Sequence, residues 1–430
     1  MESWFPVFFQ WFVLISAACL AALVCRSFIL SLAASRAGAA LSTDETPPAC
    51  GGRPFYTAGQ PVFWQIVMLA ALSRAVLYGI AYLASRIYIG SDGSFLGSIP
   101  ALWQRSDANH YVAIAKNWYV SSGEDRVFLV FLPFYPILIK LFAFAFGSEV
   151  LSGIAISLLC YCAACVLIYE VALLIGCDDG AAYGAVKCAV FFPASFFVNG
   201  AFNEGLFLLL SALFFHCLLR KKWIASGCFG LLASFTRDYG LLLALPYAME
   251  LALDAAARKP SLKFVMPRAL PILLIPAGTA AYLCVNYAVS GNFLQFLIYQ
   301  KEHWNQGFGF FFNGMRSLAA NALTFDRATS ATLFIPQLIA VILFIFLLAY
   351  GVIKKFHVSL LAYLGAYCLM SISTSWMLSF PRYMFGAFPI FSLMAAPGAK
   401  SRAADALITF VCAAGLIYLA VAYACGFHVY

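Results

Sequence analysis

Charged residues are scarce in this chain of 430 residues. Asp, Glu, Lys and Arg make up 10% of the sequence, whereas 64% of the residues are hydrophobic and the mean hydropathy is +0.90. In a typical soluble domain about a quarter of the residues are charged. So few charges cannot cover a water-facing surface, which excludes a soluble globular protein. We expect an all-α protein that crosses the lipid bilayer many times, because helices satisfy their own backbone hydrogen bonds in lipid.

Several patterns that bind metals and nucleotides are also missing. The 14 cysteines include one CxxC pair, Cys162 and Cys165, but no second pair that would complete a zinc site. Most of the cysteines lie in apolar runs, where cysteine behaves as a small hydrophobe. The chain therefore predicts neither a metal centre nor a disulfide framework. No Rossmann or P-loop pattern occurs, which argues against a soluble nucleotide-binding domain. We find no convincing internal repeat.

The net charge of +8 comes from clusters of Lys and Arg that each adjoin an apolar run. The positive-inside rule marks such clusters as cytoplasmic loops, so we predict no nucleic-acid partner. The opposite, external face then receives the loop 291–330, the turn 377–382 and residues 199–204. The clusters lie at 220–222, 258–268, 354–355 and 400–402.

The apolar runs predict about 11 to 13 transmembrane helices, since about 20 apolar residues span a bilayer. Residues 1–60 would form an additional N-terminal helix and a cytoplasmic linker, and 61–430 the main transmembrane domain. The run 223–254 is long and broken at Arg237 and Asp238, which predicts two short helices. The candidate spans are 8–35, 61–87, 128–146, 150–175, 181–198, 202–219, 223–254, 269–289, 331–353, 357–376, 383–398 and 404–426.

The sidedness predicted from the first half of the chain does not fit the sidedness predicted from the later basic clusters. The number of membrane crossings between them is too large or too small by one. The arginines at 36 and 53 place the linker inside and residues 88–127 outside. One segment must then fail to cross, and 128–146, with Pro133 and Pro136, is our choice. We expect it to be re-entrant or interfacial.

The stretch WQRSDANHYVAIAKNWY, residues 103 to 119, gathers several polar groups between apolar runs. At helical spacing Asp107, Tyr111 and Ile114 share a face, with His110 beside them. Trp and Tyr at the flanks are typical of a membrane interface. We predict an external amphipathic loop helix that directs an acid at a ligand; an ordinary solvated loop helix is the alternative.

Three further polar groups interrupt apolar sequence. Asn203 and Glu204 open an apolar run, either as a helix cap stabilised by the backbone dipole or as a second acid in a cavity. Arg237 and Asp238 stand where an intramembrane charge costs about 2.5 kcal/mol or more. They either pair with each other, or the arginine binds an anion. Arg382 begins an external-side span and either snorkels to lipid phosphate or binds a substrate phosphate.

Acids and arginines from separate parts of the chain thus reach one face, which predicts a cavity for an anionic substrate delivered through the membrane. In this order, the motifs resemble the GPI mannosyltransferase II (PIG-V-like) family of GT-C membrane glycosyltransferases, its bacterial members included. Ser106 and Asn203 depart from the residues that the family usually has. The matching segments are SDANHYVAIA at 106–115, FLPFYP at 131–136, FFPA at 191–194, FNE at 202–204, TRDYG at 236–240, GNFLQFLIYQKEHW at 291–304 and PRY at 381–383.

The resemblance implies a GT-C-type helical bundle whose active site lies on the non-cytoplasmic face, for instance of a bacterial inner membrane. It implies a donor in which a sugar, expected to be mannose, is attached to polyprenyl phosphate. The sugar would be transferred to a glycan or lipid acceptor with inversion of its anomeric configuration. Asp107 and Glu204 would be the catalytic acids, with Asp107 as general base. Arg237 and Arg382 would bind the donor phosphate. The substrate-binding residues would be His110, Tyr111, Asn203, Gln300 and Trp304.

Three alternatives stay open. A divalent metal ion held by Asp107 and Glu204 is compatible with the sequence, but two carboxylates do not establish it. A transporter or flippase of lipid-linked saccharides would also need an anion cavity, but such a protein predicts an inverted repeat. An inactive family member that acts as a scaffold is the third, because Ser106 replaces the usual Trp.

Overall fold

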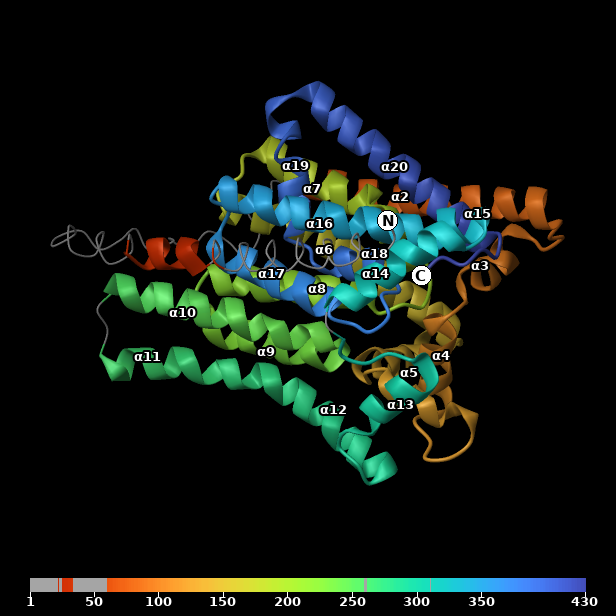
Figure 1. The fold of residues 1–430 in the computed structure, drawn as a ribbon, viewed down its shortest axis with the longest axis horizontal. Helices are drawn as coiled ribbons and strands as arrows, with labels where there is room; N and C mark the ends of the chain where they lie inside the picture. Colours follow the sequence, from red (N-terminus) through yellow and green to blue (C-terminus); the bar gives the residue numbers. More distant parts are fainter. Residues whose placement is uncertain (1–21, 23–24, 34–59, 259–260, 310) are drawn as a thin grey trace, which may run out of the picture.

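The structure, a computed structural model, is built from helices (Figure 1). Within the described part of the chain there is no named strand, and one isolated antiparallel bridge joins Phe308 to Thr374. The expected N-terminal span 8–35 and the linker 36–60 lie largely outside the described residues. The described residues are 22, 25–33, 60–258, 261–309 and 311–430.

Long helices and short ones are interspersed along the chain. The first half contains α2 (Gln60–Ile89), α3 (Phe95–Trp103), α4 (Asp107–Asn117), η1 (Glu124–Val130), α5 (Phe134–Phe146), α6 (Glu149–Leu174), α7 (Asp179–Phe191), η2 (Pro193–Asn199), α8 (Glu204–Leu219), α9 (Trp223–Thr236), η3 (Asp238–Leu243) and α10 (Ala244–Arg258). The second half contains α11 (Leu262–Ala269), η4 (Leu270–Leu273), α12 (Leu274–Ser290), α13 (Gln295–Trp304), α14 (Phe311–Thr324), α15 (Arg327–Thr329), η5 (Ser330–Phe334), α16 (Ile335–Ile353), α17 (Val358–Ile372), α18 (Phe380–Gly386), α19 (Ile390–Ala395), η6 (Gly398–Lys400) and α20 (Arg402–Ala424).

Among the described residues, six stretches of helix are long and apolar enough to cross a membrane, and two bent helix pairs raise this to eight if each pair is one span. Three shorter apolar helices, α8, α9 and α17, accompany them. This is the architecture of a multi-pass integral membrane protein. These spans are fewer than the 11 to 13 expected for the whole chain. Several apolar runs fold as bent or shortened helices, and the expected span 8–35 lies largely outside the described residues. The six are Pro61–Ile89, Glu149–Leu174, Asp238–Arg258, Lys263–Ser290, Arg327–Ile353 and Arg402–Ala424.

Two segments singled out by the sequence contain a break between helices. The apolar run 223–254 is interrupted at Arg237, between α9 and η3. The segment 128–146 forms η1 and α5, which meet at 111° near Pro133. Such a bend is the geometry of a broken span or a re-entrant loop, because proline removes a backbone donor and interrupts the helix.

Helices α6 and α8 lie in the centre of the molecule. The helix α8 packs against α6 and α9, and α9 packs against α12, while α7 and α5 flank α6. Most residues of α8 are buried. Figure 1 shows α9 to α12 along one flank of the bundle and α20 along the opposite flank. The first residue of α8, Glu204, therefore starts from the middle of the protein.

The two ends of the bundle differ in their polar residues. At one end, Lys221 before α9 and His357 before α17 both approach Glu250 of α10, at 2.7 and 3.7 Å. Figure 1 shows α4, α5 and α13 gathered at the other end, away from the end of α10 and the start of α11. The site residues predicted from the sequence lie at this second end.

Candidate active site

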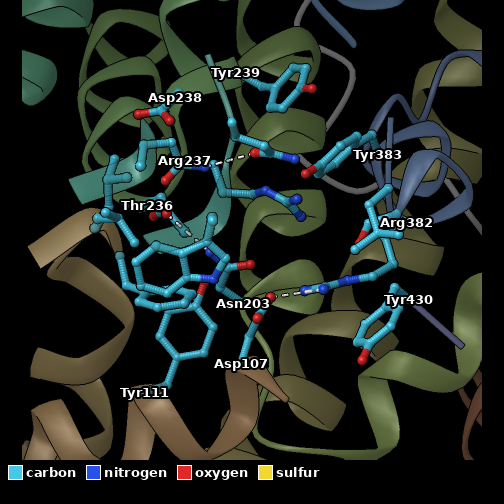
Figure 2. Close-up of a pocket in the computed structure, with 18 of the residues that line it drawn as sticks. Asp107, Tyr111, Asn203, Thr236, Arg237, Asp238, Tyr239, Arg382, Tyr383 and Tyr430 are labelled. Carbon is cyan, nitrogen blue, oxygen red and sulfur yellow. Dashed lines mark hydrogen bonds and ion pairs between the residues drawn. The ribbon is translucent and has the colours of Figure 1, made fainter. Parts of the chain in front are cut away.

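A cavity of about 240 Å³ opens among the first residues of α4 and η3, the residue before α8, and the segments around α13 and α18 (Figure 2). It combines acids, arginines, amides and aromatic rings. Seven of the nine predicted site residues line it. The lining residues are Asp107, Tyr111, Val130, Phe131, Leu132, Asn203, Thr236, Arg237, Asp238, Tyr239, Gln300, Trp304, Gln306, Trp376, Leu378, Ser379, Arg382, Tyr383 and Tyr430.

Asp107 is the first residue of α4, where the helix dipole favours a negative charge. The residue before it, Ser106, has a φ of +51°, a strained backbone conformation for a residue with a side chain. One carboxylate oxygen of Asp107, Oδ2, accepts a hydrogen bond of 2.8 Å from Nη1 of Arg382. Its side chain is 28% exposed, so the carboxylate is both held by an arginine and open to the cavity.

Glu204 is fully buried and does not line the cavity, but it bonds to two arginines that do. Its Oε1 accepts hydrogen bonds from Nη1 of Arg237 at 3.2 Å and from Nη2 and Nε of Arg382 at 2.7 and 3.0 Å. The next residue, Gly205, lets the start of α8 press against α6, since a β carbon there would collide with the carbonyl oxygen of Ser157. Glu204 therefore opens a helix and belongs to a charged cluster, but it does not line the cavity as an acid there would.

Arg237 follows α9, and its guanidinium group points into the space that Arg382 reaches from the other side (Figure 2). Its ion pair is with Glu204 and not with Asp238, whose exposed side chain points away from it. A β carbon at Gly240 would collide with the backbone of α9, so glycine allows η3 to fold back here. This fold-back directs Arg237 inward. The Nε and Nη2 groups of Arg237 donate no hydrogen bond to a described residue.

Arg382, on α18, connects the two acids. The short helix starts after Ser379, whose φ is +69°. The Arg382 guanidinium group lies over the rings of Phe197 and Phe202, at 4.6 and 5.1 Å from their centroids. Burial opposes its charge, but the carboxylates of Glu204 and Asp107 outweigh burial and raise its pKa well above the usual range. Arg382 therefore stays charged and fixes both acids.

The arrangement of these groups leaves no joint metal site between Asp107 and Glu204. A guanidinium group, already bonded to both carboxylates, stands between them. Among the described residues, no three His, Cys, Asp or Glu side chains are grouped so that they could hold a metal ion.

The remaining predicted residues take different places. Tyr111, Gln300 and Trp304 line the cavity. Asn203 lines it as well, and its Nδ2 donates to the carbonyl oxygen of Thr236 at 3.1 Å. This bond joins the start of α8 to the end of α9, which brings Glu204 and Arg237 together.

His110 is not part of the cavity wall. Its ring contacts the rings of Phe128 and Phe131, with centroids 4.5 and 5.0 Å apart, and meets Trp304 edge-on. Phe131 and Trp304 do line the cavity. His110 therefore supports the wall from behind.

The pKa of His110 gives a prediction on pH dependence. Burial lowers the pKa of this imidazole below 6.5, although nearby Asp107 partly opposes the shift. Between the lowered value and about 6.5, the unfolded chain binds a proton that the folded chain excludes, so stability falls as the pH falls through this window. We expect a lower Tm at pH 5 than at pH 7.5, with a smaller difference in His110→Phe.

The exposed His428, which is not among the groups that shift the pKa of His110, serves as the control for this experiment. His428→Gln should keep the pH dependence of the wild type. An unchanged pH dependence in His110→Phe would show that other groups cause it.

Sequence reasoning missed part of the cavity rim. The segments 305–309 and 373–376 pair there, through Gly309 N to the Ser373 carbonyl at 2.9 Å and Ser375 N to the Gly307 carbonyl at 2.8 Å. This pairing places Gln306 and Trp376 on the cavity. The one signal in the sequence is the run STS at 373–375, a polar interruption at the end of an apolar run.

Other missed residues are aromatic. Tyr239 and Tyr383 line the cavity within motifs quoted for their arginines, and Tyr430 reaches it after α20 (Figure 2). Tyrosine is so common in this chain, at 22 residues, that no sequence signal separates these three from the rest.

Comparison with protein-family models, with curated proteins and with solved structures gave no match. Fold and site together define the class: a multi-pass helical membrane protein with a cavity lined by Asp107 and by two arginines that share the buried Glu204.

Proposed function

We propose that the protein is an integral-membrane glycosyltransferase of the GT-C type. It would move a sugar, mannose in the first instance, from a polyprenyl-phosphate donor to an acceptor, with inversion. The supporting observation is the way Arg382 holds Asp107 at the cavity, beside the free N–H groups of Arg237. An open carboxylate next to a guanidinium group suits proton removal and anion binding within one small space.

In the proposed reaction, an acceptor hydroxyl oxygen attacks the anomeric carbon of the donor. A new glycosidic bond forms, and the bond between that carbon and the phosphate oxygen breaks. Asp107 takes the hydroxyl proton, and the electron pair leaves with the polyprenyl phosphate. Arg237 stabilises the departing phosphate, since it keeps N–H groups toward the cavity.

Glu204 and Arg382 have a supporting part in this mechanism. The guanidinium group of Arg382 donates three hydrogen bonds to carboxylates, which leaves it fewer donors for phosphate than Arg237 has. Glu204 is inside the protein and cannot meet an acceptor directly. We therefore assign Asp107 as the catalytic residue, with Glu204 as the counter-ion of both arginines.

The acceptor would occupy the side of the cavity formed by α13 and the paired rim. Gln300 Nε2 donates to Gln306 Oε1 at 2.7 Å, and Gln306 Nε2 donates to the Trp376 carbonyl at 3.3 Å. Amides fixed in this way suit the hydroxyl groups of a glycan or lipid headgroup, and Trp304 supplies a ring face.

We place the cavity on the non-cytoplasmic side of the membrane. The basic turns around Lys221 and Lys355 lie at the opposite end from the cavity, and positively charged turns favour the cytoplasm. Such a position fits a donor that arrives through the bilayer from a lipid carrier.

Arg237 is expected to act through its charge and its planar fork. Arg237→Gln should weaken binding of the polyprenyl-phosphate donor about 10- to 100-fold, because charged hydrogen bonds are worth about 1.5–3 kcal/mol. Arg237→Lys should lose less. Donor binding to purified protein in nanodiscs checks this. If Arg237→Gln lowers the Tm but leaves donor affinity intact, the ion pair with Glu204 is the sole role of the residue.

The decisive experiment incubates purified protein with labelled polyprenyl-phosphate mannose and a panel of glycan and lipid acceptors. Transfer of label to an acceptor, with release of polyprenyl phosphate, is the expected result. Absence of transfer with every acceptor would contradict the proposal. Movement of intact donor across a proteoliposome membrane would instead favour a transporter of lipid-linked saccharides.

A further inference from the structure

Arg74 lies within the membrane-spanning helix α2 and is 2% exposed. A charge at such a place is costly unless it is paired or hydrogen-bonded. No described carboxylate lies within ion-pair distance of Arg74, so its charge is met by backbone dipoles and hydroxyl groups. The contacts are Nη2 to the Val190 carbonyl at 2.7 Å, Nη1 to the Ser195 carbonyl at 2.9 Å and Oγ at 3.1 Å, and Nε to Ser73 Oγ at 3.2 Å.

These acceptors mark the break between α7 and η2, where the chain bends by 67°. Val190 belongs to the last turn of α7, and Ser195 lies in η2. The last carbonyls of a helix have no partner within that helix, and inside a membrane each needs another donor. Arg74 supplies donors to both sides of the break with one planar group. One turn further along α2, Tyr78 donates to the Asn199 carbonyl at the end of η2, at 2.5 Å.

The helix η2 in turn supports the proposed active site. Phe197 of η2 and Phe202 just beyond it carry the guanidinium group of Arg382 on their rings. Arg382 then holds Asp107. A continuous series of contacts therefore leads from Arg74 in the membrane to the carboxylate at the cavity.

We propose that Arg74 is a positioning residue: it fixes the break between α7 and η2 and so sets the place of Arg382 and Asp107. This inference rests on the proposed function for its effect on catalysis, but not for its effect on the chain around η2. Displacement of a catalytic group by about 1 Å can lower a rate about 10²-fold, so small movements of η2 would matter.

The test compares Arg74→Gln and Arg74→Lys with Arg86→Gln, an exposed arginine of the same helix, as the matched control. We expect Arg74→Gln to lower kcat about 10- to 100-fold, with KM for the donor within about twofold of the wild type. The kcat of Arg74→Lys should lie between the values of Arg74→Gln and the wild type. The ammonium group keeps the charge, but it cannot bridge both carbonyls as the planar guanidinium group does. Arg86→Gln should match the wild type.

Hydrogen exchange measured by mass spectrometry gives a readout that does not need transfer. In Arg74→Gln, the amides of residues 195–203 should exchange faster, while those of α16 stay as protected as in the wild type. Wild-type kcat in Arg74→Gln, or unchanged exchange at 195–203, would overturn the proposal. Equal losses in the Lys and Gln variants with faster exchange throughout the chain would also overturn it, because Arg74 would then serve general stability.

The outcomes also separate this inference from the proposed function. If the wild type transfers no sugar, glycosyl transfer is wrong, and the exchange of residues 195–203 alone decides whether Arg74 fixes the break. If the wild type transfers sugar and Arg74→Gln does so equally well, the proposed function stands and the role of Arg74 falls.

Discussion

Asp107→Asn is expected to lower the rate of sugar transfer about 10²- to 10⁴-fold, the contribution typical of a general base. The asparagine oxygen can still accept the hydrogen bond that Arg382 donates at 2.8 Å, so the side chain should keep its place. What it loses is the ability to take a proton. The Tm should therefore change little, and single-turnover transfer with labelled donor measures the effect.

The matched control for Asp107 is Asp125, an exposed acid of η1. Asp125→Asn removes the same charge from a nearby loop and should transfer sugar at the wild-type rate. Wild-type turnover by Asp107→Asn would remove this residue from the mechanism. An equal loss of rate in both variants would show that the negative charge of this region matters for transfer, and that Asp107 does not act as a base.

Glu204→Gln is expected to destabilise the folded protein by about 3–5 kcal/mol, the range for breaking a buried ion pair. Two nearly buried guanidinium groups, of Arg237 and Arg382, share one oxygen of this carboxylate. Glutamine keeps the shape but leaves Arg237 without its carboxylate partner and Arg382 with Asp107 alone. Reversible unfolding in mixed micelles measures the loss.

Glu149 provides a control that separates the cap from the ion cluster. It also stands in the first turn of a helix, α6, but its carboxylate is 32% exposed and lies 3.9 Å from Lys116 Nζ. Exposed pairs of this kind contribute about 0–1 kcal/mol, so Glu149→Gln should have a small effect. If Glu204→Gln costs no more than Glu149→Gln, Glu204 serves as a helix cap and the arginines do not depend on it.

The site residues are far apart along the chain, so the sequence could suggest which residues form the site but not which of them form ion pairs. Asp107 and Arg382 are 275 positions apart, and Glu204 and Arg237 are 33 apart. Scarcity of charge made each residue conspicuous. The choice of partner depends on how α4, α8, α9 and α18 pack, and no local pattern records this. The ion pair between the neighbours Arg237 and Asp238 was therefore a reasonable alternative, but the structure pairs Arg237 with Glu204 instead.

The sequence alone determined the class of the molecule. Hydropathy is a property of each segment by itself, so long apolar runs predicted helices in a membrane. Local chemistry likewise predicted the break at Arg237, which the structure confirms. It also predicted that 128–146 is re-entrant or interfacial, and this segment bends by 111°, as in a broken span or a re-entrant loop.

Only the tertiary structure decided which polar groups act together. It placed His110 behind the cavity wall, added Gln306 and Trp376 at the rim, and put Arg382 between Asp107 and Glu204. The physical reason is that a buried charge is stable only where counter-charges or dipoles from other helices surround it. Those partners come from distant parts of the chain, so their meeting is fixed by helix packing and not by neighbours in sequence.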